Sequence, residues 1–238
     1  MLSFTFNNKD SYQDFGIVIK TRPTMPLPER NVNYIEVLGR NGSLTEDIGT
    51  YKDIVLSVDC FVYDEVDLAG AMRKIKGWLS EGQSELIFSH IPDTKYIGQV
   101  TSQMDITPSF KVVGEFTIQF KCQPYSYPVF NPLITILDKN TIINNSFTAT
   151  SDPEITIYGS GNITLTITDY WGNIQSVTLT NVSEYITINS AMMECYKGID
   201  LFNEKMSGKF PKLVVGNNTI SWIGSVVKIE VLTNFRFI

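Results

Sequence analysis

Few side chains in this sequence could do chemistry. His90 is the single histidine in 238 residues, which excludes a mechanism that needs two histidines or a histidine-rich metal site. A Ser-His-Asp or Cys-His arrangement would have to use His90, and no G-x-S-x-G sequence accompanies it. We therefore interpret His90 as a loop or strand-end residue that is hydrogen-bonded locally.

Neighbouring carboxylates could serve glycoside hydrolysis, which needs two acidic side chains. Three such pairs occur: Glu46 with Asp47, Asp64 with Glu65, and Asp152 with Glu154. Each lies near an expected turn or strand end, where solvated charges are common, and the D-x-[DN]-x-[DN]-G calcium pattern is absent. We predict that the chain is not an enzyme and has no catalytic, cofactor-binding or metal-binding residues.

Two other segments could form ligand sites. Gly159-Ser160-Gly161-Asn162 lacks the G-K-[ST] ending of a phosphate-binding loop and is interpreted as a turn between strands. Tyr170 and Trp171 precede Gly172-Asn173 and could form a flat stacking platform for a sugar ring, or could fill a core between two sheets. Trp222 lies in an alternating segment and is predicted to be buried.

The composition narrows the class of protein and its compartment. The net charge is −6, so the chain lacks the excess of cations that nucleic-acid binding requires. Cys60, Cys122 and Cys195 are far apart, which favours buried free thiols and leaves one disulfide possible. The first thirty residues contain charges where a signal peptide would be apolar, and no segment is long and apolar enough to span a membrane. We expect folding in a reducing cytoplasm.

The elements that would position these residues are mainly strands. Residues 54–62 and 116–122 alternate with a period of two, so that one face of each strand is apolar and the other polar. Asn41-Gly42 follows Gly39-Arg40 between two further strand segments and indicates a hairpin.

One segment has helical periodicity. Residues 68–80 are preceded by Asp67, which can cap the first turn. The apolar stripe of this segment consists of Leu68, Met72, Ile75 and Leu79. The sequence therefore predicts one helix that packs on a sheet.

The chain is predicted to form two β-rich domains, residues 1–125 and 126–238. Two prolines interrupt the alternation within residues 123–128, so this segment is interpreted as a linker. Beyond it, residues 155–158, 163–167, 177–179 and 186–188 are short strand candidates separated by turn residues. That spacing is typical of an antiparallel sandwich. The first domain is predicted to be sandwich-like, with one packed helix and a projecting hairpin.

Several motifs, in this order, resemble the distal tail (Dit) family of long-tailed phages. They are Phe4-Thr5-Phe6, the segment from Tyr34 to Leu44 around Gly39-Arg40-Asn41-Gly42, Gly77-Trp78-Leu79, residues 116–125, residues 157–165, and residues 208–213. The resemblance covers nearly the whole chain, although no single motif is diagnostic.

The resemblance implies a structural hub of the phage tail tip. In this family a homo-hexameric ring joins the major tail tube protein to the tail-tip lysin, and DNA passes through the ring without specific binding. The C-terminal domain would be a galectin-like sandwich that carries or contacts a receptor-binding protein. The protein would be made in the host cytoplasm and become part of the virion. An alternative is a carbohydrate-binding module that contacts a host glycan through the C-terminal sandwich.

A ring of identical subunits needs an interface in which one patch meets a different patch on the neighbour. Exposed strand edges and a projecting hairpin can supply such a patch. We therefore predict a subunit interface at the hairpin, formed by Tyr34, Glu36, Gly39, Arg40, Asn41 and Gly42. Tyr170 and Trp171 remain the candidate glycan platform.

Overall fold

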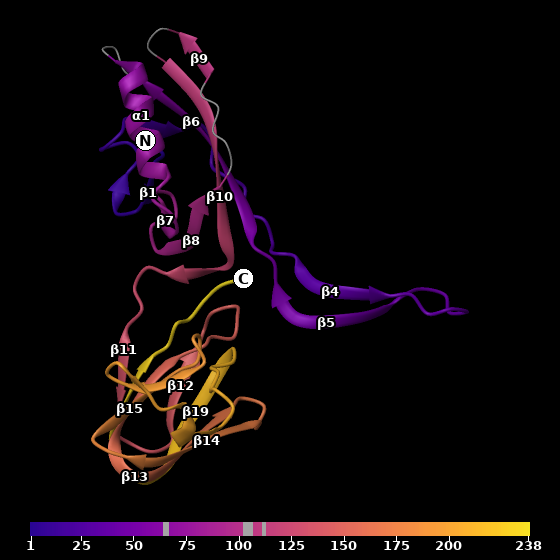
Figure 1. Ribbon diagram of the computed structural model, residues 1–238, viewed down its shortest axis with the longest axis vertical. Coiled ribbons are helices and arrows are strands. Elements are labelled where there is room, and N and C mark those ends of the chain that lie inside the picture. The colour runs from indigo at the N-terminus through magenta and orange to yellow at the C-terminus, as the bar shows by residue number, and fades with distance from the viewer. Residues whose placement is uncertain (64–66, 102–106, 111–112) are drawn as a thin grey trace. The chain divides into compact units, whose positions relative to one another are not determined.

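A computed structural model describes residues 1–63, 67–101, 107–110 and 113–238 (Figure 1). The chain divides into two compact units, one of residues 1–129 with Ile238 and one of residues 130–237. Strands dominate both units, and the described residues include one α-helix, α1 (Leu68–Leu79). The predicted mainly β fold is confirmed. The acidic pair Asp64 and Glu65 lies outside the described residues.

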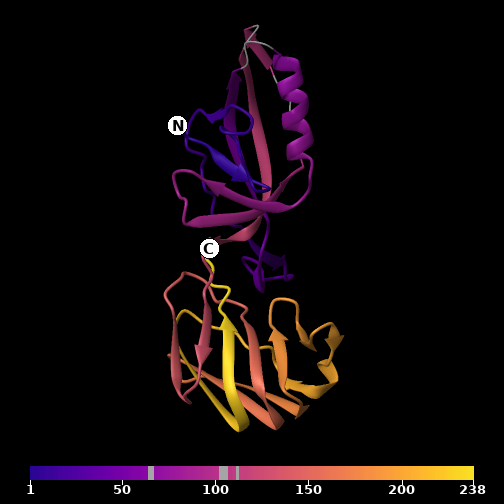
Figure 2. The same cartoon turned by 90° about the vertical axis from the view of Figure 1, so that its left-hand side faces the viewer.

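The first unit is built on an eight-stranded antiparallel sheet. Its order is β2-β1-β7-β8-β10-β6-β3, and β9 also pairs with β10. The strands are β1 (Phe4–Phe6), β2 (Lys9–Asp10), β3 (Ile17–Ile19), β6 (Ile54–Tyr63), β7 (Ser84–Phe88), β8 (Thr94–Val100), β9 (Thr107–Phe110) and β10 (Val113–Pro128). Figure 2 shows α1 lying along this sheet, with Ile75, Trp78 and Leu79 buried in the same apolar core as the strands.

The alternation predicted for β6 and β10 is confirmed. Each inward-facing residue from Ile54 to Val62 and from Phe116 to Cys122 is buried. The two strands pair directly, with Ile118 opposite Val58. Because both strands present apolar side chains on the same face, their pairing forms the centre of the core.

The three cysteines are free and buried, as predicted. Cys60 and Cys122 lie in the first unit and Cys195 in the second. Burial raises the pKa of the Cys60 and Cys122 thiols to about 12 and that of Cys195 to about 11. These thiols are therefore protonated at neutral pH, and burial and protonation both make a thiol inert.

The helix begins and packs as the sequence indicates. Asp67 is the N-cap, and its Oδ1 accepts a hydrogen bond from the Gly70 amide at 2.8 Å. Leu68 packs against the core without being fully buried, and Met72 is half-buried. The apolar stripe predicted from the sequence did not include Trp78, which is 2% exposed. Its indole adds a second apolar row to the buried face.

Gly77 offers a test of the helix. A Cβ added at this exposed position would meet nothing within 4 Å, and the backbone is ordinary α-helix. We expect Gly77→Ala to raise the free energy of unfolding of the first unit by about 0.5–1 kcal/mol. Gly70→Ala is the contrasting variant, because its Cβ would lie 2.1 Å from the Asp67 carboxylate that caps the helix. Thermal unfolding that ranked Gly70→Ala above Gly77→Ala would contradict this account.

The segment predicted as a linker is the end of a strand. β10 continues through Pro124 to Pro128, so the linker interpretation of residues 123–128 was wrong. Pairing with β6 ends at Cys122 opposite Ile54, and pairing with β8 shifts register between Cys122 and Ser126. Proline is tolerated here because this part of β10 has a bulge and lacks its second neighbour.

The second unit is a nine-stranded antiparallel sheet folded over one core. Its strands are β11 (Leu133–Ile136), β12 (Thr141–Asn145), β13 (Glu154–Asp169), β14 (Ile174–Val182), β15 (Tyr185–Asn189), β16 (Glu194–Lys197), β17 (Asp200–Leu201), β18 (Met206–Gly208) and β19 (Gly216–Leu232), with a short 3-10 helix at Asn203–Lys205. β13 and β19 pair along their lengths. Their outer partners differ between the two halves, since β15 and β11 flank one half and β14 and β12 the other. Both halves contribute to one buried apolar cluster, as in a sandwich.

The sequence predicted a turn at Gly159-Ser160-Gly161-Asn162, and this prediction was wrong. The segment is the middle of β13. The register with β19 shifts on both sides of it, so the strand bends where it passes from one half of the unit to the other. A Cβ at Gly159 would lie 2.2 Å from the Ser225 carbonyl oxygen, and one at Gly224 would lie 2.4 Å from that of Asn162. The glycines therefore allow two bent backbones to approach closely.

Candidate functional site

The clearest candidate for an interaction site is a hairpin that leaves the first unit. It consists of β4 (Arg30–Ile35) and β5 (Leu44–Tyr51), which pair with each other in a separate two-stranded sheet. Figure 1 shows it extending away from the large sheet of this unit. A two-stranded ribbon is at best marginally stable in water by itself. Contact with a partner protein would therefore stabilise such a ribbon.

The tip of the hairpin spans residues 36–43. Its backbone turns at Gly39 and Gly42, with φ of 82° and 79°, and the Arg40 amide bonds to the Val37 carbonyl at 3.1 Å. Asn41 does not have a positive φ, so the turn depends on Gly39 and Gly42 and not on the Asn41-Gly42 pair from which the hairpin was predicted. The hairpin itself is present as predicted.

The hairpin exposes apolar side chains along its length. Leu38 at the tip is 105% exposed, Tyr34 is 68% exposed and Ile48 is 56% exposed. Ile35, Val37 and Leu44 are exposed as well. So many exposed apolar side chains on one projecting ribbon are typical of an interaction site. We call the side chains of residues 34–48 the hairpin surface.

The two strands at the base of the hairpin are joined by a charge contact, and a ring contact joins this base to the large sheet. Arg30 forms an ion pair with Asp47, and its guanidinium lies 5.3 Å from the centroid of the Tyr51 ring. Tyr51 in turn contacts Tyr125 of β10 edge to face, with centroids 5.9 Å apart. These contacts fix the hairpin where it joins the sheet and leave its tip without support.

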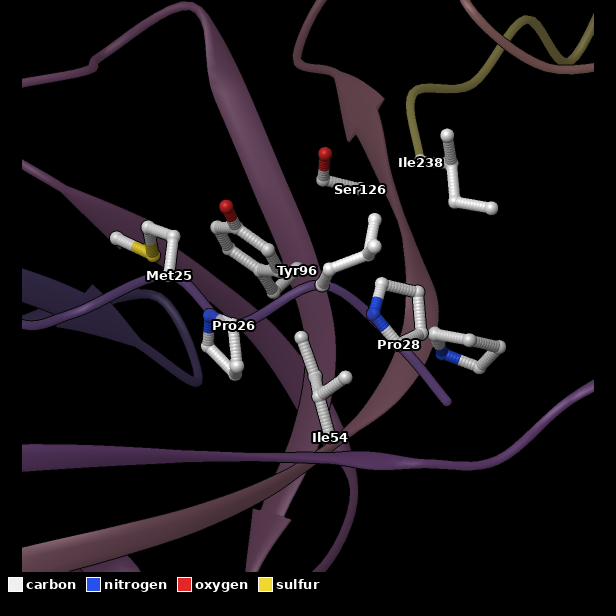
Figure 3. Close-up of a pocket in the computed structure, with 9 residues that line it drawn as sticks. Met25, Pro26, Pro28, Ile54, Tyr96, Ser126 and Ile238 are labelled. Atoms are coloured by element: carbon white, nitrogen blue, oxygen red, sulfur yellow. The ribbon is translucent and has the colours of Figure 1, made fainter. Parts of the chain in front are cut away.

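A small pocket of about 200 Å³ lies beside this base (Figure 3). Pro26 and Pro28, from the segment that enters the hairpin, face Ile54 and Tyr96 of the sheet. Prolines fix the backbone dihedral φ, so this entry segment is stiff. Stiffness at the base limits the directions in which the hairpin can extend.

Protonation of Asp47 offers a test of the base. The Gly49 N–H, which donates to Asp47 Oδ1 at 2.8 Å, and then Arg30 lower the pKa of this carboxyl below its ordinary value of 3.8. A depressed native pKa stabilises the hairpin base above the unfolded pKa, and this contribution is lost as pH falls through the native pKa. We expect the Gly49 amide NMR signal to stay constant from neutral pH to about pH 4 and to move below it. Asp47→Asn should remove that movement, and its persistence in the variant would contradict the assignment.

The predicted interface residues lie together on this hairpin. Tyr34 is in β4, and Glu36, Gly39, Arg40, Asn41 and Gly42 form most of the tip, all of them exposed. The sequence prediction did not include the base residues Arg30 and Tyr51. The register next to the tip, with Ile35 opposite Leu44, would by itself place Arg30 opposite Gly49. A register shift between Arg30 and Val32 places it opposite Tyr51 instead, so no local signal in the sequence could have found this pair.

The predicted glycan platform is exposed but not flat. Tyr170 and Trp171 are 71% and 68% exposed, and their rings meet at 82°. Asp169 fixes the turn, because its Oδ1 accepts hydrogen bonds from the Trp171 and Asn173 amides at 2.9 and 2.8 Å. The Asn173 side chain, which also donates to Asp169, is the main cause of the lowered pKa of that carboxyl. Trp222 is buried, as predicted.

The remaining polar candidates are not arranged for catalysis. Burial, and then the charge of Arg22, lower the pKa of His90, and its Nδ1 is buried with no hydrogen-bond partner, which corrects the predicted local hydrogen bond. Asp47 bonds to Arg30, Asp152 to Arg236, and Glu154 to Asn189, so each is engaged in its own contact. Within the described ranges no group of three His, Cys, Asp or Glu residues could hold a metal.

Comparison with known proteins decides the family. Residues 3–122 match the family described as phage tail protein RIFT-related domain. The chain belongs to this family. The match extends from β1 into β10 and so includes the hairpin. No curated protein sequence matches.

A solved structure shares the fold of the whole chain. The Dit (gp 19.1) protein of phage SPP1, described as a paradigm of the hub adsorption apparatus in phages that infect Gram-positive bacteria, superposes with a TM-score of 0.78 at 14% identity. The alignment covers 100% of both chains. The resemblance to the distal tail family is thus confirmed in family and fold.

The chain is therefore a structural phage tail protein and a component of the virion. Neither match is to an enzyme. In the described part of the chain, no helix has the length and apolar character needed to cross a membrane.

Proposed function

We propose that this protein is the hub of the phage tail tip, a ring of six copies that joins the major tail tube protein to the tail-tip lysin. The family assignment and the Dit fold support a tail-tip role. The observation that carries the ring is the hairpin surface, which exposes Tyr34, Leu38 and Ile48 on a ribbon that pairs with no other strand among the described residues. A projecting patch of this kind suits the heterologous contact that closes a ring.

The two units would have different tasks. The first unit, which includes the hairpin, would form the ring and contact the tube protein and the lysin. The second unit, residues 130–237, would be a galectin-like domain that carries or contacts a receptor-binding protein. DNA would pass through the ring unbound, which suits a chain with a net charge of −6. A lumen lined mainly by lysine and arginine would contradict this last point.

The solution mass of the purified chain tests the ring. Light scattering behind size-exclusion chromatography, over a range of concentrations, should give a mass near six times 26.8 kDa. The ring could require a neighbouring tail protein in order to close. The same measurement is therefore repeated with added tube protein and with added lysin. A chain that stays monomeric in all three samples would contradict the proposal.

A second candidate function is glycan binding by the second unit. The exposure of Trp171, on a turn fixed by Asp169, favours it. Because the Tyr170 ring is perpendicular, one sugar ring would stack on the Trp171 indole alone. We expect Trp171→Ala to abolish binding on a glycan array and Tyr170→Ala to weaken it less. Equal binding by wild type and Trp171→Ala, or no binding by the wild type, would exclude this site.

A further inference from the structure

The second unit contains a pocket that neither the hairpin nor the aromatic turn explains. Its volume is about 930 Å³. Three separate segments meet around it: residues 174–176 at the start of β14, residues 190–193 after β15, and residues 208–212 from the end of β18. Asp152 completes the wall. The pocket is thus assembled by the tertiary fold and not by one loop.

The wall of the pocket is largely apolar and uncovered. Ile174 and Met193 are 69% and 66% exposed, and Phe210 is half-buried beside them. An aliphatic chain, a thioether and one partly covered ring form an adaptable surface for another apolar side chain, since methionine adjusts to irregular shapes. They do not form the open aromatic plane on which a sugar ring stacks.

One polar group of this wall has no partner. Ser190 is 6% exposed, and its hydroxyl is buried without a hydrogen bond. Leaving a buried hydroxyl unpaired costs free energy, and an occupant that supplies a carbonyl or amide group would recover it. The same hydroxyl can donate or accept, so it suits a peptide backbone.

The charges around the pocket favour an anion. Lys209 has no ion-pair partner among the described residues, and Lys212 Nζ lies 3.7 Å from Asp152 Oδ1. Asp152 is also bound to Arg236, Nη2 to Oδ2, at 2.8 Å. The carboxylate is therefore already neutralised, and the pocket is locally positive on a chain whose net charge is −6.

The segment that carries the two lysines is held in place. The Gln175 amide donates to the Lys212 carbonyl and accepts from the Lys212 N–H, both at 2.9 Å. This double contact imitates the pairing of a strand and fixes residues 208–212 against β14. A preformed wall lowers the entropy that binding would cost.

We propose that this pocket binds a short polypeptide segment of a partner protein, one that inserts an apolar side chain flanked by carboxylates. The apolar side chain covers Ile174 and Met193, the partner's backbone bonds to Ser190, and a carboxylate meets Lys209. The proposal goes beyond the hub function and does not require the ring. The test of the pocket can therefore fail while the ring proposal holds, and the ring proposal can fail while the pocket binds its peptide.

NMR of the full chain labelled at its methionine methyl groups tests the site. The probe is the peptide acetyl-Asp-Leu-Asp-amide, with acetyl-Lys-Leu-Lys-amide as its charge-reversed control. We expect the Met193 signal to move with the acidic peptide and less with the basic one. Met192 is the internal control, because it is adjacent and 63% exposed but does not line the pocket. An unmoved Met193 signal, or equal movement of both methionines, would overturn the proposal.

A matched pair of serine variants separates binding from folding. The hydroxyls of Ser190 and Ser151 are both buried and unpartnered, and Ser190 alone of the two lines the pocket. Because neither loses a hydrogen bond, Ser190→Ala and Ser151→Ala should both fold with unchanged or higher thermal stability. We expect Ser190→Ala to weaken peptide binding about three- to tenfold and Ser151→Ala to leave it unchanged.

A saccharide is the competing occupant. If N-acetylglucosamine moved the Met193 signal and the acidic peptide did not, the pocket would be a glycan site and the proposal would be wrong. Equal peptide affinity of Ser190→Ala and wild type would also contradict it, since the backbone contact would then be absent.

Discussion

Leu38→Asp is expected to reduce the solution mass of the proposed ring to that of one chain. Leu38 is 105% exposed at the hairpin tip. Burial against a neighbouring subunit would therefore remove more apolar surface from water at Leu38 than at the other residues of the hairpin. Burying a leucine is worth about 1.5–3 kcal/mol per contact, and an aspartate there would add the cost of an unpaired charge. The subunit dissociation constant should rise on the order of 100-fold or more. Light scattering over a concentration series measures this rise.

Ile199→Asp is the matched control. Ile199 is 98% exposed on a turn of the second unit, whereas the hairpin belongs to the first unit. Both variants remove an exposed aliphatic side chain, so each should change the free energy of unfolding by about 0.5 kcal/mol or less. Equal masses for the two variants, whether both assembled or both monomeric, would show that the hairpin tip is not the decisive contact.

The strands of the core could be predicted because their signal is local. In β6 and β10, each buried apolar residue is two positions from the next, and one buried face is enough to produce this pattern. The helix was found for the same reason, since Asp67 and the stripe lie within one segment. Trp78 was missed because it lies beside the row formed by Leu68, Met72, Ile75 and Leu79 and not in line with it.

The bends in the long strands could not be predicted from single segments. Gly159 and Gly161 look like a turn when β13 is read alone. The strand continues because β19 bends opposite it, where Gly224 has a φ of 110°. The same holds for Pro124, because proline interrupts a strand only where a neighbouring strand would accept a hydrogen bond from the N–H that proline lacks. The identity of the facing strand is information that a local pattern does not contain.

The candidate site likewise has one part that the sequence predicted and other parts that it did not. The hairpin tip was predicted from Asn41-Gly42, because the two strands that such a dipeptide joins are close in the sequence as well as in space. The base depends on Tyr125, which arrives from β10, distant in sequence. The pocket around Met193 combines three segments and left no motif in the sequence.

Trp78→Ala is expected to lower the free energy of unfolding of the first unit by about 3–5 kcal/mol. The indole stacks on Phe4 and Phe15, with ring centroids 5.6 and 4.2 Å apart, and is 2% exposed. Its Nε1 donates to the Phe6 carbonyl at 3.0 Å, which joins the helix to β1. Truncation to alanine removes the stacking, opens a cavity and leaves a buried carbonyl without its partner.

Trp78→Phe separates packing from the hydrogen bond. Phenylalanine keeps most of the stacking but cannot donate to the Phe6 carbonyl, so it should cost less than alanine, about 1–3 kcal/mol. Trp171→Ala is the control for loss of an indole, because Trp171 is 68% exposed and its removal should cost about 0.5 kcal/mol or less. Hydrogen exchange of the β1 and β15 amides monitors each unit separately, which matters because two units need not unfold together. Faster exchange in β15 than in β1 for Trp78→Ala would contradict the assignment of this indole to the core of the first unit. If β1 is selectively affected, the core that anchors the hairpin depends on the helix as well as on the sheet.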